Sequence, residues 1–228
     1  MKQSALLFDL DGTLVDSVPD LAMAANRLLA ELGRAPLEIP DIARMVGDGV
    51  AALVERVLAA RGVEEGAAEA ALPRFVALYE KDAATLTRPY PGVEAVLGRF
   101  AGEGVRLAVC TNKPEAATRR VLEGVGLARF FSVVLGGDSL PQRKPDPAPL
   151  LAALHRLGAA PGMAAMVGDH RNDVLAAHGA GVSTVFARYG YGLATLGALR
   201  PDAVIDSFGA LPGALEVLSS QSSVVSRR

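Results

Sequence analysis

The chain has 228 residues, half of them apolar, so it can bury a hydrophobic core in one domain, or in one domain with a smaller second one. Basic and acidic residues nearly balance, 23 against 25, and we therefore expect neither nucleic acid nor an anionic membrane as a partner. A single cysteine excludes an internal disulfide, and no apolar stretch approaches the roughly 20 residues of a membrane-spanning helix, so we expect a cytoplasmic protein.

Short apolar runs that end in Gly, Asp or Thr alternate with segments of helical spacing along most of the chain. This alternation is typical of an α/β protein with a largely parallel, buried sheet. The expected strands are Ala5 to Phe8, Val105 to Cys110, Val133 to Leu135, Ala164 to Val167, Ser183 to Ala187 and Ala203 to Ile205. Crossover helices are expected to begin near Glu115, Ala148, Asn172 and Phe208.

The interval between the first two strands contains no convincing strand. Its apolar residues recur every three or four positions, and it is too long for a loop. We therefore predict a helical cap over residues 18–87, inserted into an α/β core made of residues 1–17 and 88–228. The serine-rich segment 219–228 lacks a helical stripe and is expected to be a flexible tail.

Two carboxylates follow the first strand. Asp9 and Asp11 alternate along an extended segment, so both can converge at the carboxyl end of that strand, where ligand sites of open α/β sheets lie. Gly12 then permits a tight turn. Two neighbouring carboxylates repel each other unless a cation compensates them, which favours a divalent metal. A solvated acidic turn is the alternative for this string taken alone.

Polar and basic groups follow two later strands. Thr111 and Asn112 stand at an expected helix start with Pro114 in its first turn, a place that suits phosphate. Taken alone, both residues are also typical helix caps. Further on, Lys144 precedes Pro145, whose ring restricts the backbone and would hold the ammonium in a fixed direction. Without the other segments, an ordinary surface loop is the simpler interpretation.

A second pair of carboxylates follows the fourth strand. Asp169 lies at the strand end and Asp173 one helical turn further on, so both can reach one site from the same side. Magnesium prefers oxygen ligands and keeps several waters, so few protein carboxylates suffice. Helix capping by Asp169 and solvation of Asp173 are the alternatives for either residue alone.

Four functional segments in chain order at predicted strand ends identify a resemblance to the haloacid-dehalogenase superfamily of phosphatases. The matching strings span nearly the whole chain and are Asp9-Leu10-Asp11-Gly12-Thr13, Thr111-Asn112, Lys144-Pro145 and Gly168-Asp169 to Asp173. Within the superfamily, the chain most resembles phosphoglycolate phosphatases, in Val46 to Gly49, Thr87 to Gly92, Cys110 to Pro114 and Gly136 to Pro141. His170 departs from the pattern, since relatives usually carry a small residue there; we expect a partly exposed histidine at a helix start.

The resemblance implies a three-layer α/β/α Rossmannoid core and a magnesium-dependent phosphatase that forms an aspartyl-phosphate. Asp9 would attack phosphorus, and Asp11 would protonate the leaving alkoxide and later activate water. The implied magnesium ligands are Asp9, the main-chain carbonyl of Asp11, Asp169 and Asp173, the last directly or through water. The implied phosphate-binding groups are Thr111, the main chain of Asn112 and Lys144.

The same resemblance implies a small phosphate ester as substrate, 2-phosphoglycolate, hydrolysed to glycolate and phosphate (EC 3.1.3.18). In the cap, Gly47 and Gly49 would let the main chain approach a small ligand, beside Asp48. Arg44 or Lys113 would supply the positive charge for the substrate's acid group. We expect a monomer or a weak homodimer.

Two other functions stay open at this point. A sugar phosphomutase, or a sugar-phosphate phosphatase, of the same superfamily shares all four segments and differs mainly in its cap. A phospho-receiver signalling domain also forms an aspartyl-phosphate on a parallel sheet. Against the receiver, the acceptor here follows the first strand, the second acidic pair follows the lysine, and a helical segment interrupts the fold.

Overall fold

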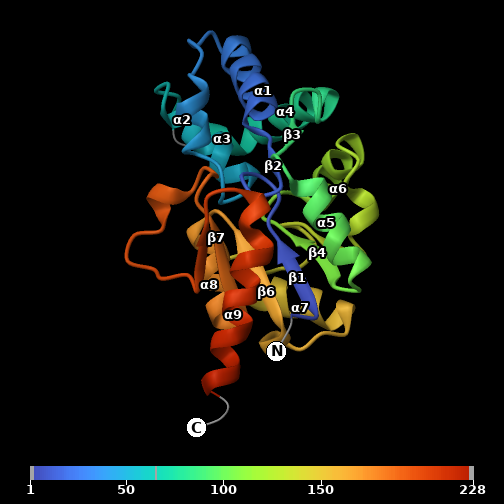
Figure 1. Cartoon of the computed structure of the whole chain (residues 1–228). Helices are drawn as coiled ribbons and strands as arrows, with labels where there is room; N and C mark the ends of the chain where they lie inside the picture. The colour runs from blue at the N-terminus through green and yellow to red at the C-terminus, as the bar shows by residue number, and fades with distance from the viewer. Residues whose placement is uncertain (1–2, 65, 226–228) are drawn as a thin grey trace.

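Six short apolar segments form one sheet in the computed structural model, which describes residues 3–64 and 66–225. The strands lie in the order β5-β4-β1-β6-β7-β8, and neighbours run parallel (Figure 1). The bounds are Ala5–Phe8 for β1, Arg106–Cys110 for β4, Val133–Leu135 for β5, Ala164–Gly168 for β6, Ser183–Ala187 for β7 and Ala203–Ile205 for β8. The strands predicted from the sequence are therefore confirmed to within one residue at each end.

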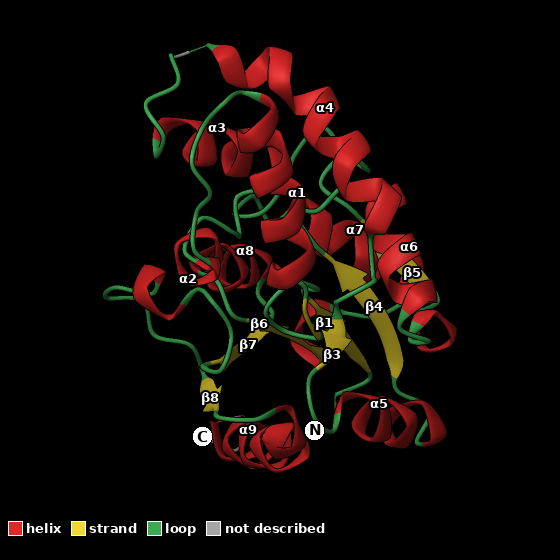
Figure 2. Ribbon diagram, turned by 90° about the horizontal axis from the view of Figure 1, so that it is seen from above, coloured by secondary structure: helices red, strands yellow, loops and turns green. Residues whose placement is uncertain are grey.

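Helices cover both faces of this sheet. In β1, Leu6 and Phe8 belong to one apolar cluster and Ala5 and Leu7 to another, and all four are fully buried. A central parallel strand is covered on both sides, which explains its uninterrupted apolar run. The first cluster includes residues of α5 (Val93–Gly102), α6 (Glu115–Gly124) and α9 (Leu211–Val225), and the second includes residues of α7 (Ala148–Leu157) and α8 (Arg171–Ala180). Figure 2 shows α5 and α9 on one side of the sheet and α7 and α8 on the other, which confirms the predicted three-layer α/β/α fold.

The sequence analysis did not predict helix α5. Its buried side chains recur at helical spacing, at Val93, Val96, Leu97 and Phe100. The helix follows Gly92, which has a φ of +86° and so takes a left-handed conformation that suits glycine. This helix has only ten residues and lies between turn residues and an apolar strand, so its helical spacing was not recognised in the sequence.

Four further helices form the insert between β1 and β4. They are α1 (Val18–Glu31), α2 (Ile39–Ala43), α3 (Val50–Ala59) and α4 (Ala67–Asp82). They bury a further apolar cluster, which Ala117 of α6 joins from the core and in which the rings of Phe75 and Tyr79 stack with their centroids 6.4 Å apart. Figure 1 shows these helices above the carboxyl ends of the sheet strands. The predicted helical insert is thus confirmed.

The insert joins the core through a short antiparallel pair of strands, β2 (Val15–Asp16) and β3 (Arg88–Pro89). Beside it, the buried carboxylate of Asp20 accepts hydrogen bonds from the main-chain N–H of Leu86, at 2.9 Å, and of Thr87, at 2.8 Å. The first turn of α1 is therefore fastened to the segment that returns to the core. Two-residue strands leave no periodicity in a sequence, so these two strands were not predicted. The domain boundaries at 17/18 and 87/88 stay a prediction.

The carboxyl-terminal helix α9 is longer than expected. Leu215 and Leu218 pack into the core, and the hydroxyls of Ser219 and Ser220 donate to the carbonyls of Leu215 and Val217. These bonds satisfy the hydroxyls of two serines that a helix accommodates, and the helix runs through Val225. Residues 219–225 of the expected tail are thus helical, while the expected flexibility of the segment stays a prediction and residues 226–228 lie outside the described residues.

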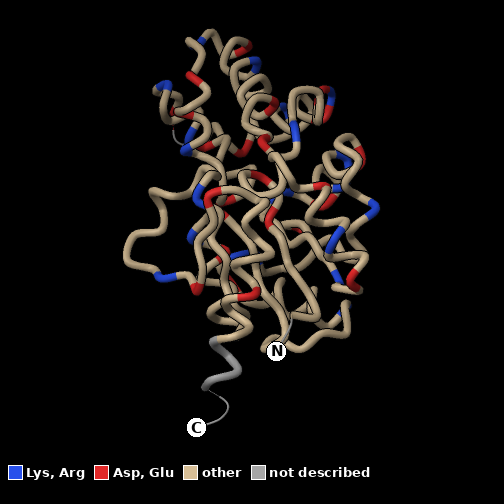
Figure 3. The backbone as a smooth tube through the Cα atoms, in the orientation of Figure 1, with Lys and Arg blue, Asp and Glu red and all other residues tan. Residues whose placement is uncertain are grey.

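Charged residues of both signs are interspersed over the insert and the core (Figure 3). Among the residues that the structure describes, no helix is long and apolar enough to cross a membrane. The expected cytoplasmic location and the expected oligomeric state stay predictions.

Candidate active site

Three adjacent strands carry polar side chains to one edge of the sheet. Asp9 follows β1, Thr111 follows β4 and Asp169 follows β6, and β1 lies between the other two strands. Because parallel strands end at the same edge, these residues meet under the helical insert. The strand-end residues expected to form a site are thus brought together by the sheet.

Lys144 links two of the carboxylates. Its Nζ lies 3.1 Å from Asp9 Oδ1 and 2.5 Å from Asp173 Oδ1, and the lysine side chain is 2% exposed. Burial alone lowers the pKa of Lys144, but the attraction of Asp173 and Asp9 outweighs it and raises the pKa above its usual value. The ammonium therefore stays charged and fixed between two carboxylates.

Asp9, Asp169 and Asp173 form a compact group of three buried carboxylates. One oxygen from each lies within 4.8 Å of the others. Burial raises the pKa of Asp9 to about 6, although Lys144 opposes the rise, and burial together with the charges of Asp9 and Asp173 raises the pKa of Asp169 well above its usual range. One ammonium cannot compensate three carboxylates, so this set of hard oxygen donors fits a divalent cation.

Asp169 is held from several sides. Its Oδ2 accepts hydrogen bonds from the main-chain N–H of Tyr191, at 2.8 Å, and of Gly192, at 3.2 Å, while Thr13 Oγ1 donates to Oδ1 at 3.0 Å. A Cβ on Gly12, whose φ is +81°, would lie 2.4 Å from Asp169 Oδ2. Glycine is therefore required where the first loop passes this carboxylate.

The side chain of Asp11 lies outside the group of three. Its carboxylate accepts a hydrogen bond from Ser17 Oγ at 2.5 Å and pairs with Lys113 Nζ at 3.2 Å. We expect Asp11 to bind the metal through its main-chain carbonyl and not through its side chain. That contact stays a prediction. The Asp11 side chain faces the cavity described below, which suits a group that exchanges protons with a substrate.

Asn112 connects the core to the insert. Its Nδ2 donates to the carbonyl of Lys144 at 2.9 Å and to that of Gly47 at 3.2 Å. The neighbouring Thr111 lies beside Asp9, and a hydrogen bond from its hydroxyl is one of the effects that oppose the raised pKa of that carboxyl. The structure therefore places both residues at the site, with the Asn112 side chain joining two loops.

A small cavity separates the insert from the carboxyl ends of the strands. Its volume is about 90 Å³, far below the roughly 300–1,000 Å³ of pockets for drug-sized ligands. Apolar residues of the insert line one side, among them Leu21, Val50, Leu53 and Phe75, and Asp9, Asp11 and Asp169 line the other. The cavity therefore suits a small ligand, and an anionic group at the carboxylate side requires a cation there.

The loop from Val46 to Gly49, called the cap loop below, brings two glycines of the insert to this cavity. Gly47 and Gly49 line the cavity, and a Cβ on Gly47 would lie 2.5 Å from the ring of His170. Asp48 is not among the described residues that line it. Its carboxylate instead accepts from Asn172 Nδ2 at 2.8 Å and pairs with Arg56, so the structure places this cap candidate beside the cavity loop, and its role toward the substrate stays a prediction.

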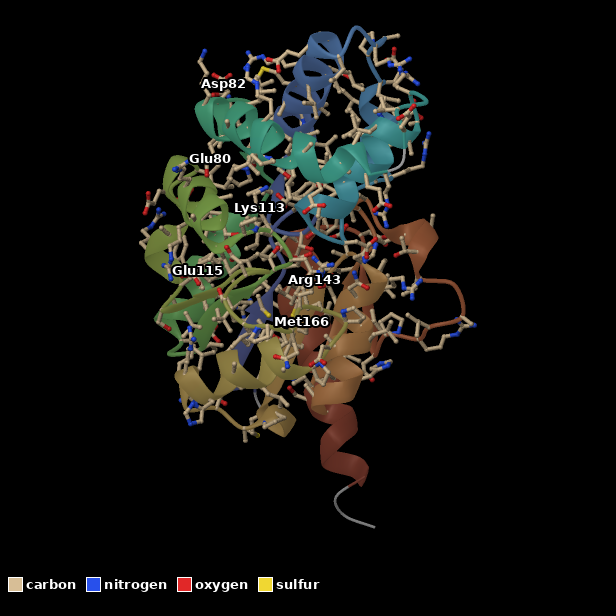
Figure 4. All side chains as sticks on the ribbon, turned by 180° about the vertical axis from the view of Figure 1, so that it is seen from behind. Glu80, Asp82, Lys113, Glu115, Arg143 and Met166 are labelled. Atoms are coloured by element: carbon tan, nitrogen blue, oxygen red, sulfur yellow. The ribbon has the colours of Figure 1, made fainter. Side chains whose placement is uncertain are left out.

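Arg44 and Lys113, the two candidates for the positive charge that meets the substrate's acid group, lie in different places. The side chain of Arg44 is 66% exposed and pairs with Asp41, and Arg44 does not line the cavity among the described residues, so the structure gives this alternative no support and its substrate contact stays untested. The short helix α2 buries Ile42, which leaves the side chain two positions later outside. Lys113, by contrast, is buried and lines the cavity, and Figure 4 shows it at the level where the insert meets the core.

Comparison with known proteins decides the family of this chain. The family model of the haloacid dehalogenase-like hydrolases matches residues 6–187, which include all four groups of site residues. The chain belongs to the haloacid dehalogenase-like hydrolase family.

Relatives of this haloacid dehalogenase-like hydrolase are similar over most of their length. A phosphoglycolate phosphatase of Rhodospirillum rubrum is 49% identical over 216 residues, which cover 91% of this chain and 88% of that one. A phosphoglycolate phosphatase of Neisseria meningitidis is 45% identical over 224 residues, covering 95% and 94%. A crystal structure of a predicted phosphoglycolate phosphatase from Haemophilus somnus superposes with a TM-score of 0.88 at 32% identity, covering 93% of this chain and 98% of that one.

Within this haloacid dehalogenase-like hydrolase, His170 is not partly exposed as expected. It is 5% exposed and caps α8: its Nδ1 accepts from the N–H of Asn172, and its own N–H donates to Asp173 Oδ2 at 2.9 Å. Burial lowers the pKa of the imidazole. The cap loop at Gly47 closes over the ring, which explains the burial of this helix-start residue.

The sequence analysis missed Tyr191. Its N–H donates to Asp169, and its hydroxyl donates to Asp16 Oδ1 at 2.6 Å and accepts from the N–H of Ser17 at 3.0 Å. One residue thus connects the carboxylate group with the start of the insert. The sequence signal that could have revealed Tyr191 is the pair of glycines on either side of it. A Cβ on Gly190 would lie 2.4 Å from Asp169 Cβ, so the chain can pass this close to the carboxylate only with glycine there.

Proposed function

We propose that this haloacid dehalogenase-like hydrolase is a magnesium-dependent phosphatase that hydrolyses 2-phosphoglycolate to glycolate and phosphate. The observation that carries the proposal is the buried group of Asp9, Asp169 and Asp173 beside the ammonium of Lys144. It supports a role for Asp9 as the nucleophile, because the charge of a phosphate could be compensated beside it. The names of the relatives from Rhodospirillum rubrum and Neisseria meningitidis support the choice of substrate.

The first half of the proposed reaction transfers the phosphoryl group to Asp9. A carboxylate oxygen of Asp9 forms a bond to phosphorus while the bond from phosphorus to the glycolate oxygen breaks, and Asp11 gives its proton to that oxygen. Lys144, Thr111 and the main chain of Asn112 bind the phosphoryl oxygens. Asp9, Asp169 and Asp173 would hold magnesium, which would supply the positive charge that lets an anionic ester approach these carboxylates.

The second half regenerates the enzyme. Asp11, now ionised, accepts a proton from a water molecule whose oxygen attacks phosphorus, and the bond from phosphorus to Asp9 breaks. Phosphate leaves, and Asp9 and Asp11 return to their starting states. The insert, whose apolar side chains line the cavity opposite Asp9, limits the access of bulk water to the aspartyl-phosphate.

The substrate assignment is tested by comparing esters. We expect kcat/KM for 2-phosphoglycolate to exceed that for glucose 1-phosphate, glucose 6-phosphate and a nucleoside monophosphate by at least about tenfold at equal magnesium, because a cavity of about 90 Å³ excludes larger groups. Each reaction is followed by phosphate release. A preference for a hexose phosphate would overturn the assignment, and interconversion of sugar phosphates without phosphate release would indicate a mutase.

Magnesium binding should stabilise the protein more at pH 7.5 than at pH 5. Burial raises the pKa of Asp9 from 3.8 to about 6, so the folded metal-free protein holds this proton more tightly than the unfolded chain. Its stability therefore falls as the pH rises from about 4 through about 6, by about 3 kcal/mol for this group, and a bound cation offsets that loss. Thermal melts with and without magnesium measure the difference; equal shifts at both pH values would contradict it.

A further inference from the structure

Lys113 joins the acid residue of the core to a helix of the insert. Its Nζ lies 3.2 Å from both oxygens of Asp11 and 4.5 Å from the ring centre of Tyr79, which belongs to α4. The attraction of Asp11 outweighs the burial of Lys113 and raises its pKa above the usual value, so the ammonium is charged. It is the only lysine or arginine among the described residues that line the cavity.

The hydroxyl of Tyr79 is an unsatisfied polar group in the same cavity. It is buried and has no hydrogen-bond partner among the described residues, although a buried hydroxyl is normally paired. The ring faces the ammonium and stacks on Phe75, so both position and direction of the side chain are fixed. The hydroxyl therefore stands beside the ammonium of Lys113, and the other insert residues that line the cavity are apolar apart from Glu80.

We propose that Lys113 Nζ and the Tyr79 hydroxyl together bind the carboxylate of the substrate; this rests on the function proposed above. A carboxylate accepts from both donors at once, through its two oxygens. The ligand class is a phosphate ester of a short 2-hydroxy acid, because one end must reach Asp9 while the other reaches Lys113 inside a cavity of about 90 Å³. An ester without the carboxylate leaves both donors unused.

Binding in this way has two structural consequences. The substrate carboxylate takes the ammonium from Asp11, so the Asp11 side chain, no longer paired, can receive a proton from solvent and turn toward the ester oxygen that it must protonate. The substrate carboxylate also bridges Lys113 of the core and Tyr79 of the insert. A substrate with a carboxylate therefore holds the core and the insert together over the reacting phosphate. Lys113 and Tyr79 are therefore specificity-determining residues for this reaction.

The test compares 2-phosphoglycolate with 2-hydroxyethyl phosphate, which has a neutral hydroxyl in place of the acid. The quantity measured is the ratio of the two kcat/KM values at equal magnesium. Loss of a charged donor in Lys113→Met should lower this ratio about 10- to 100-fold, and loss of the hydroxyl in Tyr79→Phe about 3- to 10-fold. Lys81→Met, on the exposed face of α4, is the matched control and should leave the ratio unchanged.

The outcomes separate this inference from the proposed function. If the wild-type protein does not hydrolyse 2-phosphoglycolate, the proposed function fails. If it does, but the ratio is unchanged in folded Lys113→Met, the carboxylate site is overturned while the function stands. A merely structural role would lower kcat/KM for both esters alike and leave the ratio constant. Should Lys113→Met fail to fold, the ratio in Tyr79→Phe decides: a fall supports the site, and no change overturns it.

Discussion

Replacement of Asp9 by asparagine should abolish phosphate release, lowering kcat by roughly 10⁴- to 10⁶-fold, because an amide cannot form the bond to phosphorus. The fold should survive. Asparagine has the same shape, and its Oδ1 can still accept the hydrogen bond that Asp9 Oδ1 receives from the N–H of Leu10 at 2.8 Å. Lys144 also keeps its second partner, Asp173.

Two measurements establish this result. Phosphate release is compared in wild-type protein and Asp9→Asn, and acid-quenched samples with labelled substrate are examined for covalently bound phosphate, which only the wild type should carry. Asp206→Asn is the matched control, since that carboxylate is 70% exposed and pairs with Arg188 at the surface. A folded Asp9→Asn protein with wild-type turnover would exclude the covalent mechanism.

Removal of divalent metal should lower activity by at least about 10³-fold, because a metal ion at a phosphoryl-transfer site typically contributes several kcal/mol. Three buried carboxylates with one ammonium between them repel an anionic ester when no further cation is present. Magnesium should restore the rate. Calcium should not, because it takes more ligands at longer bonds and would misalign Asp9 with phosphorus.

The measurement uses protein treated with chelator and then dialysed, assayed before and after each metal is added back. Circular dichroism should be unchanged by the treatment, because Lys144 continues to hold Asp9 and Asp173. Full activity of metal-stripped protein in excess chelator would refute the metal roles of Asp169 and Asp173.

The positions of site residues that follow directly from the order of the strands could be predicted from the sequence. Asp9, Thr111 and Asp169 each end an apolar run, and parallel strands end at a common edge, so their convergence follows from local pattern and one topological rule. The sheet, the insert and the carboxylate group were therefore predictable. The roles of these residues in the reaction stay predictions that the experiments above test.

The direction of side chains in the insert could not be predicted in the same way. Arg44 and Asp48 stand in or beside short segments where a change of one position turns a side chain from the cavity to the surface. The contact between Lys113 and Tyr79 depends on how the insert sits on the core, and no periodicity encodes that. Tyr191 was missed for the same reason, since its partners Asp16 and Asp169 are distant in the chain.

The position of β1 at the centre of the sheet affects the order of events during synthesis. Its Ala5 lies opposite Arg106 on one side and Ala164 on the other, so this strand pairs only with segments made much later than itself. Its contacts are among the least local in the molecule, and such contacts slow folding. Until β6 has been synthesised, one edge of β1 has no partner strand, and its fully apolar side chains are exposed to aggregation or to chaperones.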